Sequence, residues 1–463
     1  MGMRPWILGA VSVMLAAGLC SGCDSDSEDT STLVEQPGET AEDVVIEEDV
    51  FVSNEDAEAL ESDITKPTDG DDVSEPDVEE DAGAEQDIDE EEQTDGEESE
   101  EEDTLSDALN PEESLPAFAK KGPYNAGLRI YTITYNLPGL EEPRTIEVGV
   151  WYPTEDTEGE SIAWGGLLQE EDLFVNASVL ELPEGEQFPV RAYTHGNMGL
   201  MGDSSNTSEF FASHGWVTVA PNHTGNTLLD FIEPRPPWMF YARPRDMKEA
   251  LDHMEGLESP DPLAGALNLE EIVLMGHSYG GYTGYGLVGA EFDYPGIESA
   301  CTGGEGPISG PCTPEQLAEF GKSVQDPRFV AYAPLDGGNP DVYGESGVQK
   351  VEVPMLQMYA IEPEAGAHSG SEVYWNWLKD TKSIVRVGIE GGCHIGFTLG
   401  FCNGISDEEG YKIIHAYLMA FSQHHVLGQT FPELTELMSG ELTVSEQTLF
   451  EITEEAKTYW DGL

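Results

Sequence analysis

The sequence predicts an α/β protein in which a mostly parallel β-sheet is flanked by helices. From about residue 188 to residue 425, short apolar runs typical of buried strands alternate with stretches whose apolar residues recur at helical spacing. The polar, glycine-containing motifs of this region directly follow the apolar runs. That placement is expected where the carboxyl ends of parallel strands meet at one edge of a sheet, which is where such folds place their sites.

The first predicted elements form a β-hairpin and the beginning of the parallel sheet. Two alternating segments, 128–135 and 145–153, flank a turn containing Pro and Gly and predict the hairpin. The acidic insert after them is predicted to be irregular. Residues 188–199 then start as an apolar strand and enter a His-Gly loop, and the serine-rich segment 204–215 predicts a helix. Residues 216–223 predict the next buried strand.

The second half of this region continues the alternation. Residues 242–257 predict a helix with Pro244 near its first turn. A strand over 271–278 is followed by a helix rich in small residues. The remaining predicted elements are three strands and a closing helix, over residues 328–336, 353–362, 383–392 and 406–425.

A segment of very different composition precedes the α/β region. The chain has 463 residues and a net charge of −73, and residues 24–103 hold 37 Asp and Glu and a single Lys. Large apolar side chains are sparse there, so the segment cannot bury enough surface to offset its ordering entropy. We expect residues 24–112 to be a disordered acidic linker and residues 113–463 to form one folded domain. Because the whole chain is acidic, nucleic acid is not an expected partner.

The first 23 residues predict an export signal. Arg4 precedes an apolar run over residues 6–19 that is too short to span a bilayer. The following "LCSGC" resembles a bacterial lipobox, which would make Cys23 the lipidated first residue of the mature protein. The expected location is the bacterial cell envelope, in the periplasm or at the cell surface, with the lipid on Cys23 as the only contact with the membrane.

Four further cysteines are present, and export permits disulfides between them. Their proximity in sequence favours the pairs Cys301–Cys312 and Cys393–Cys402, and the alternative is four free thiols. None of these pairs has the CxxC spacing of a zinc site, so no metal is expected.

Gly276-x-Ser278-x-Gly280 has the pattern of a nucleophile elbow. A serine on such a sharp turn between a strand and a helix requires small residues two positions before and after it. Here the motif follows the apolar strand "EIVLM" and precedes a helix, which is the expected context. Ser278 is therefore the candidate nucleophile.

A serine hydroxyl needs a general base, and in this arrangement an acid and then a histidine follow the serine in the chain. His394 lies in a glycine-rich turn after the last predicted strand and is the candidate base. His368 lies in a polar loop, and the later histidines are expected to have surface or capping roles in the closing helix. Asp336 ends one strand and is the preferred acid, while Glu362 ends the next strand and is the alternative.

An oxyanion hole needs backbone N–H groups aimed at the developing negative charge. Tyr279 follows the candidate nucleophile and is expected to supply one N–H group. Asn197 is expected to supply the other from the loop after the strand ending in "YTHG", with Met198 as the second choice. The aromatic residues of the proline-rich segment 231–246 either wall an acyl pocket or cover its entrance from a loop, or they belong to the core, which is the more common role of buried aromatic side chains.

The segments "THGNMG", "RPRDMKEALDHM", "LMGHSYGGYTG", "PRFVAYAPLDGG" and "IEGGCHIGFT" together resemble the α/β-hydrolase superfamily. Within it they are similar to the branch of platelet-activating-factor acetylhydrolase, dienelactone-hydrolase-like enzymes and polyester hydrolases. In the acetylhydrolase branch the acid lies in a segment like "APLD", which supports Asp336. Many other α/β hydrolases use the later strand, which would favour Glu362.

The resemblance implies that residues 113–463 are an α/β-hydrolase catalytic domain. Its expected activity is hydrolysis of carboxylic esters by a Ser-His-Asp triad through an acyl-enzyme, without cofactor or metal. The expected partner is a small-molecule or lipid ester, and the protein is expected to be a monomer. The alternatives are a catalytically silent binding protein and a peptidase on the same fold.

Overall fold

The computed structural model describes residues 115–164, 168–363, 366–367, 369–400 and 402–463. The predicted export signal and acidic linker lie outside these residues and stay predictions. Within the described residues, no helix has both the length and the apolar character that crossing a bilayer requires.

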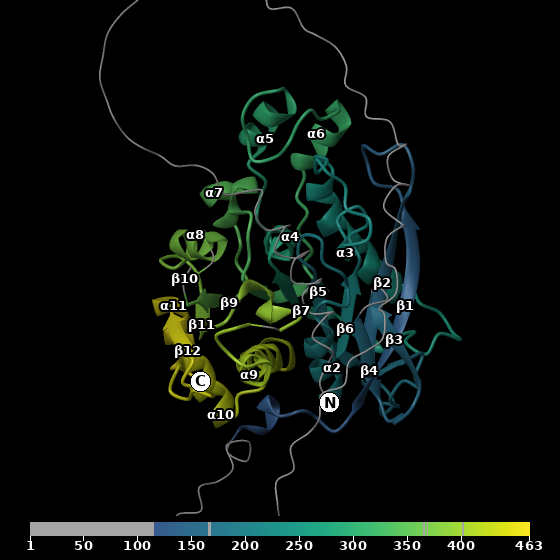
Figure 1. The fold of residues 1–463 in the computed structure, drawn as a ribbon, viewed down its shortest axis with the longest axis vertical. Coiled ribbons are helices and arrows are strands. Elements are labelled where there is room, and N and C mark those ends of the chain that lie inside the picture. Colours follow the sequence, from purple (N-terminus) through teal and green to yellow (C-terminus); the bar gives the residue numbers. More distant parts are fainter. Residues whose placement is uncertain (1–114, 165–167, 364–365, 368, 401) are drawn as a thin grey trace, which may run out of the picture. The chain divides into compact units, whose positions relative to one another are not determined.

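One sheet organises the described chain (Figure 1). Its strands are β1 (Asn125–Tyr135), β2 (Arg144–Thr154), β3 (Glu160–Trp164), β4 (Leu168–Val175), β5 (Phe188–Thr194), β6 (Val217–Pro221), β7 (Leu267–His277), β8 (Phe329–Leu335), β9 (Met355–Glu362), β10 (Gly366–Ala367), β11 (Ile384–Glu390) and β12 (Thr448–Ile452). The spatial order is β12-β11-β9-β8-β7-β5-β6-β2-β1-β4-β3, and β10 pairs with β9.

The central strands, in the order β6-β5-β7-β8-β9-β11, are all parallel to one another. The predicted hairpin is present as the antiparallel pair β1–β2 and extends the sheet beyond β6. The expected mostly parallel sheet is therefore confirmed. After β5 the chain moves outward to β6 and then crosses back to β7 on the other side of β5. This reversal is the point at which doubly wound sheets open a crevice for a ligand.

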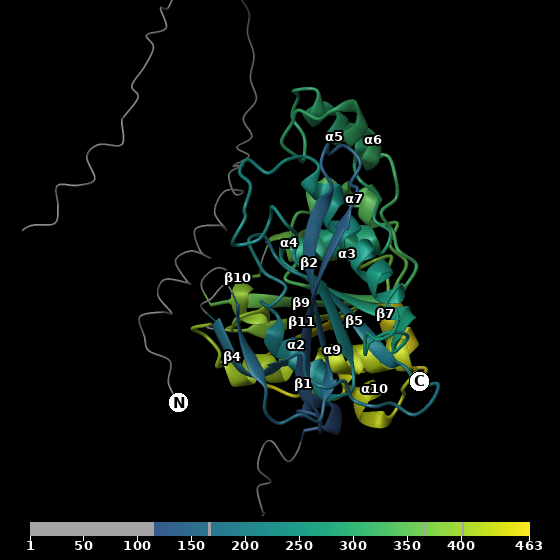
Figure 2. The same ribbon diagram turned by 90° about the vertical axis from the view of Figure 1, so that its right-hand side faces the viewer.

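Helices cover both faces of the sheet. They are α2 (Ser205–Ser213), α3 (Met239–Glu255), α4 (Tyr279–Leu287), α5 (Tyr294–Cys301), α6 (Pro314–Phe320), α7 (Gly344–Val348), α8 (Ser369–Leu378), α9 (Asp407–Leu427), α10 (Pro432–Ser439) and α11 (Glu454–Trp460), with short 3₁₀ turns η1 (Ala117–Ala119), η2 (Pro340–Val342) and η3 (His394–Phe397). Figure 2 shows α9 and α10 on one side of the central strands and α3, α4 and α7 on the other.

Strand β7 shows why the sequences of the central strands are continuous apolar runs. Ile272 and Leu274 are buried against the face covered by α3 and α4, whereas Val273 and Met275 are buried against the face covered by α2 and α9. A strand covered on both faces needs apolar side chains at every position. The same double burial places the end of β7 in the middle of the molecule's core.

Two local expectations were wrong. The insert predicted to be irregular forms the antiparallel pair β3–β4, and β4 pairs with β1 along the edge that β2 leaves open. A sequence such as "LQEEDLFV" lacks regular alternation, so its strand depends on that open edge rather than on local preference. Helices α5, α6, α7, α8, α10 and α11 and strands β10 and β12 were not predicted either.

Helix α3 begins at Met239, so Pro244 lies inside it rather than near its first turn. The earlier start follows from the Pro236-Pro237 pair, whose carbonyls accept hydrogen bonds from the N–H groups of Met239 and Phe240. Phe240 is consequently a buried core residue of a helix and not part of a loop over a pocket.

Both predicted disulfides are present, Cys301–Cys312 and Cys393–Cys402. The first joins α5 to the segment before α6, in the insert between α4 and β8. Disulfides are typical of proteins outside the cytoplasm, which agrees with the expected export.

Candidate active site

Ser278 occupies a sharp turn between β7 and α4. Its backbone has φ 53° and ψ −119°, a conformation that residues with a side chain rarely adopt. A Cβ atom on Gly276 would lie 2.4 Å from the carbonyl oxygen of Gly280, and one on Gly280 would lie 2.0 Å from that of Thr194. The two glycines of the motif are therefore required by close backbone contacts, as the elbow pattern predicts.

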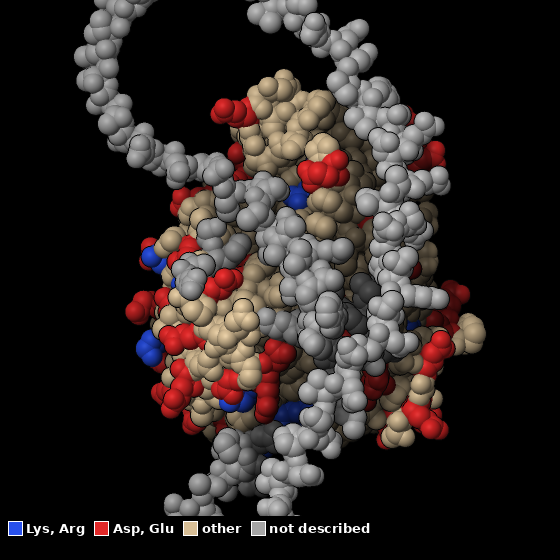
Figure 3. All heavy atoms as spheres, in the orientation of Figure 1, with Lys and Arg blue, Asp and Glu red and all other residues tan. Residues whose placement is uncertain are grey.

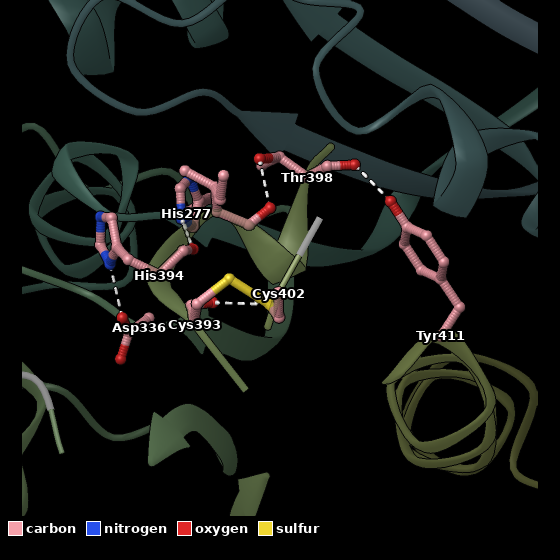
Figure 4. Close-up of a disulfide and its surroundings, with 8 residues drawn as sticks. His277, Asp336, Cys393, His394, Thr398, Cys402 and Tyr411 are labelled. Carbon is pink, nitrogen blue, oxygen red and sulfur yellow. Dashed lines mark hydrogen bonds and ion pairs between the residues drawn. A yellow bond between two sulfur atoms is a disulfide. The ribbon is translucent and has the colours of Figure 1, made fainter. Parts of the chain in front are cut away.

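Ser278, His394 and Asp336 come together although they follow three different strands. The Ser278 hydroxyl lies 2.8 Å from Nε2 of His394, and Nδ1 of His394 lies 2.5 Å from Oδ2 of Asp336. Figure 4 shows the imidazole beside the Asp336 carboxylate. Because a carboxylate accepts at Nδ1, the neutral imidazole carries its proton there and offers Nε2 to the serine hydroxyl.

Asp336 is held rigidly at the end of β8. Its side chain is fully buried, its backbone has φ 48°, and its N–H group donates to the carbonyl of Met358 at 2.8 Å. The carboxylate oxygen Oδ1 lies 3.4 Å from the N–H group of Ala360 and 3.4 Å from the hydroxyl of Ser371. Of the two carboxylates that the sequence left open, the one against His394 is that of Asp336.

The loop that carries His394 is fastened on several sides (Figure 4). Cys393 is bonded to Cys402, and the carbonyl of His394 accepts a hydrogen bond from Nε2 of His277 at 2.8 Å. The Tyr411 hydroxyl of α9 donates to the carbonyl of Thr398 at 2.5 Å. The imidazole thus sits on a short 3₁₀ turn whose two ends are tied to the strand β7 and to the helix α9.

The loop after β5, residues 195–199, passes directly beside the serine. We call it the oxyanion loop. A Cβ atom on Gly196 would lie 3.2 Å from Cβ of Ser278, and Met198 has a positive φ of 57° that turns the loop. Asn197 follows Gly196 in this turn. Tyr279 is the first residue of α4, and an N–H group at a helix start has no acceptor within its helix.

The Asn197 side chain is clamped in place. Its Oδ1 accepts hydrogen bonds from Nδ2 of Asn226 at 2.8 Å and from Nη2 of Arg235 at 2.7 Å. Asn226 in turn accepts from Nη1 of Arg243 at 2.6 Å. Sequence patterns did not identify these partners, because they come from the segment between β6 and α3 and meet Asn197 only in the folded chain.

A buried polar cluster lies under the oxyanion loop. It comprises Thr194, His195, His223, Arg243 and Asp246, all fully buried, and we call it the polar brace. His223 contacts the Thr194 hydroxyl through Nε2 at 2.7 Å and Asp246 through Nδ1 at 2.8 Å. The N–H group of His223 donates to Nε2 of His195 at 3.0 Å, and Arg243 donates to the carbonyl of His195. The "RPRD" segment of α3 supplies two of the five members.

The charges in the polar brace follow from burial and from Arg144. Burial lowers the pKa of His223 to about 3, and the Arg243 cation acts in the same direction. Burial alone would raise the pKa of Asp246, but the bidentate contact with Arg144 and the bond to His223 bring it to about 2. The cluster therefore holds an ionised carboxylate, two neutral imidazoles and the guanidinium of Arg243 beneath the loop, and the guanidinium of Arg144 lies against Asp246.

His368 lies outside the described residues. His424 was expected at the surface or in a cap, but it is buried in α9, with Nε2 2.6 Å from the Tyr459 hydroxyl. Among the described residues, no group of three His, Cys, Asp or Glu side chains could hold a metal ion.

The strand order, the elbow after β7, and the placement of Asp336 after β8 and of His394 after β11 confirm the predicted α/β-hydrolase fold. No protein-family model matches the sequence, and no curated protein matches it. A solved structure of a ferulic acid esterase from Streptomyces cinnamoneus is similar, with a TM-score of 0.49 and 16% sequence identity, over 73% of this chain and 98% of that chain.

Proposed function

We propose that this protein is a serine hydrolase that cleaves carboxylic esters through an acyl-enzyme. The observation that carries the proposal is the continuous series of hydrogen bonds from Ser278 through His394 to Asp336, which starts on a strained elbow. Strain at a single serine, together with a base and a buried acid in line, is the geometry that activates a hydroxyl nucleophile.

In the acylation half of the reaction, Oγ of Ser278 attacks the ester carbonyl carbon and its proton passes to Nε2 of His394. Asp336 holds the imidazole in the required tautomer and stabilises the imidazolium that forms. The N–H groups of Tyr279 and Asn197 stabilise the negative oxygen of the tetrahedral intermediate. His394 then donates its proton to the leaving alkoxide, and the carbon–oxygen bond to the alcohol breaks.

In the second half, His394 takes a proton from a water molecule, and the resulting hydroxide attacks the acyl carbon on Ser278. The same N–H groups stabilise the second tetrahedral intermediate. Breakdown returns the proton from His394 to Oγ and releases the acid. No step requires a metal or an organic cofactor.

The proposed setting is the bacterial cell envelope, with the catalytic domain carried on an acidic linker from a lipid at Cys23. The proposed substrates are small-molecule or lipid esters, including the acetylated lipids and polyesters of the branch that the sequence resembles. The proposed working form is a monomer that does not bind nucleic acid.

The test is covalent labelling combined with turnover. The purified protein should react with a fluorophosphonate probe and hydrolyse p-nitrophenyl acetate, and Ser278→Ala should abolish both, with kcat falling by roughly 10⁴-fold or more. A folded protein that neither reacts with the probe nor hydrolyses the ester would instead be a binding protein on this fold. Turnover of peptide amides in preference to esters would favour the peptidase alternative.

A further inference from the structure

Arg235 lies beside the proposed catalytic centre, on the loop between β6 and α3. Its Nη2 donates to Oδ1 of Asn197 at 2.7 Å, and its guanidinium carbon lies 4.1 Å from the centre of the Tyr279 ring. Asn197 and Tyr279 are the two residues proposed to form the oxyanion hole. Arg235 therefore places a full positive charge next to the position where an ester would bind.

Only some of the N–H groups of this guanidinium form hydrogen bonds within the described protein. It is half-buried, and within the described residues its Nε atom is buried and has no hydrogen-bond partner. An unpaired buried donor destabilises the fold that contains it. The Nη1 group of Arg235 forms no hydrogen bond with the described residues and is not buried, so it is the donor that a ligand can reach.

Arg235 also lacks a carboxylate partner in a strongly acidic protein. The chain has 92 Asp and Glu against 19 Lys and Arg. In the described part of the chain, Arg144, Arg245, Arg328 and Arg386 form ion pairs, whereas Arg235 forms none within 4.0 Å. The two nearest acidic residues in sequence, Glu233 and Asp230, form no ion pair with it, and Asp230 accepts from the N–H groups of Gly225 and Thr227 instead.

Arg243 is the other guanidinium that faces the Tyr279 ring, at 5.0 Å. It is fully buried, and its donors are taken by Thr283, Asn226 and the carbonyl of His195. Arg243 can therefore add to the positive field but has no room for a ligand. The start of helix α4 lies at the same place and carries the positive end of the helix dipole.

We propose that Arg235 is a specificity-determining residue that binds an anionic group, in the first place a carboxylate, on the ester substrate. The proposal rests on the ester-hydrolase function proposed above. A guanidinium is planar, and one held over an aromatic ring can present its remaining N–H groups to the two oxygens of a carboxylate. The acidic surface elsewhere repels anions, so a local cation is needed to select an anionic ester.

The experiment compares carboxylate esters with their neutral carboxamide counterparts. One pair carries the group on the acyl side, the mono-p-nitrophenyl ester of adipic acid and its carboxamide. The other pair carries it on the alcohol side, 4-carboxyphenyl acetate and 4-carbamoylphenyl acetate. The measured quantity is the ratio of kcat/KM for the charged ester to that for the neutral ester, in the wild type, Arg235→Gln and Arg235→Lys.

The wild type should prefer the charged ester in at least one pair, and the preference should fall as NaCl screens the charge. Arg235→Gln should reduce the ratio by about tenfold or more, mainly through KM, as expected for the loss of a charge-assisted hydrogen bond. Arg235→Lys should keep part of the preference. Arg245→Gln removes the same charge from an exposed position paired with Glu249 on α3 and should leave the ratio unchanged.

The ratio distinguishes recognition of the substrate carboxylate from the positioning of Asn197 by Arg235. Loss of the hydrogen bond to Asn197 would slow hydrolysis of the charged and the neutral ester equally. If Arg235→Gln lowers turnover of both esters by the same factor, Arg235 only positions Asn197 and the proposal is overturned. A wild-type ratio at or below one in both pairs overturns it as well, while leaving ester hydrolysis intact. If no ester is hydrolysed, the proposed function fails and this proposal fails with it.

Discussion

Ser278 and Asp336 are two of the five described residues with side chains that have positive φ angles, 53° and 48°, and both belong to the proposed catalytic series. Conformations of this kind cost on the order of 1–3 kcal/mol each and persist only where the surroundings enforce them. Here the parallel strands β7, β8 and β9 enforce them, since the N–H groups of Ser278 and Asp336 donate to Leu335 and Met358. The strain lies where the reaction is proposed to occur.

The acid assignment can be tested at single-residue resolution. Asp336→Asn should lower kcat by about 10⁴-fold, because an amide no longer holds the tautomer that offers Nε2 to the serine. Glu362→Gln, at the end of β9, should leave kcat within about threefold of the wild type, since a change distant from the reacting groups removes no transition-state contact. Steady-state kinetics on one ester, with circular dichroism to verify folding, gives the answer. A crippled Glu362→Gln beside an active Asp336→Asn would reverse the assignment.

Among the elements, the 3₁₀ turn η3 is held in place by a disulfide and by hydrogen bonds to neighbouring elements. It lies between Cys393 and Cys402, and Gly396 approaches so closely that an added Cβ would meet Sγ of Cys402 at 2.7 Å. The bonds from His277 and Tyr411 hold the remaining sides. An element of this length has too few internal contacts to hold a fixed geometry by itself, so the base is positioned by cross-links to its neighbours.

Removal of the Cys393–Cys402 disulfide should therefore affect catalysis directly. The double variant Cys393→Ser/Cys402→Ser should lower kcat by roughly tenfold, because a small displacement of the base is costly in a positioned reaction. The matched control is Cys301→Ser/Cys312→Ser in the α5–α6 insert, which should lower thermal stability but leave kcat within about twofold, since no reacting group lies there. Equal kcat losses in both double variants would show that η3 does not depend on its disulfide.

Helix α9 carries a second testable feature, the stacking of His415 on Phe210 of α2 at 4.0 Å. Burial lowers the pKa of His415 to about 3. A histidine that is neutral in the fold but protonated when unfolded stabilises the fold above its unfolded pKa of about 6.5. That stabilisation is lost progressively as the pH falls from 6.5 toward 3.

Replacement of His415 by Phe should therefore flatten the acid side of the stability profile. At pH 8, where the histidine is neutral in both states, the two proteins should differ by no more than about 1.5 kcal/mol, as for a similar-sized core exchange. Between pH 8 and pH 5, the wild type should lose more free energy of unfolding than the variant. Urea unfolding at both pH values measures the difference, and parallel profiles for the two proteins would contradict the neutral state of His415.

At the scale of the whole molecule, negative charge dominates. The net charge is −73, and acidic side chains are spread over the visible face of the described residues with few lysines and arginines among them (Figure 3). Self-repulsion of this size opposes the compact state. Three of the few arginines, Arg144, Arg328 and Arg386, form ion pairs with little exposure of the guanidinium, and Arg243 lies in the polar brace.

Salt should accordingly stabilise this protein. An increase from 0.05 to 1 M NaCl shortens the screening length to about 3 Å and should raise Tm by roughly 5 °C or more. Differential scanning calorimetry across that range tests this, with sucrose at matched osmolality as a control for solvent exclusion. A Tm that is constant or falls with NaCl would mean that acidic repulsion is not a significant term in its stability.

Local patterns were sufficient for much of this protein. Alternation and apolar runs identified the hairpin and the six parallel strands, since a strand covered on both faces must be apolar at every position. The elbow glycines and the positions of Asp336 and His394 at strand ends were also readable, because turns and close backbone approaches restrict residue type locally. The short separations between cysteines predicted both disulfides.

Only the tertiary structure decided what depends on contacts between distant segments. It placed Asp336, rather than Glu362, against His394, because that choice depends on how β8, β9 and β11 align across the sheet. It turned an acidic insert into the β3–β4 pair at an open sheet edge. The tertiary structure also brings the polar brace and Arg235 together around the oxyanion loop. No spacing pattern in the sequence predicts which buried polar groups will be in contact.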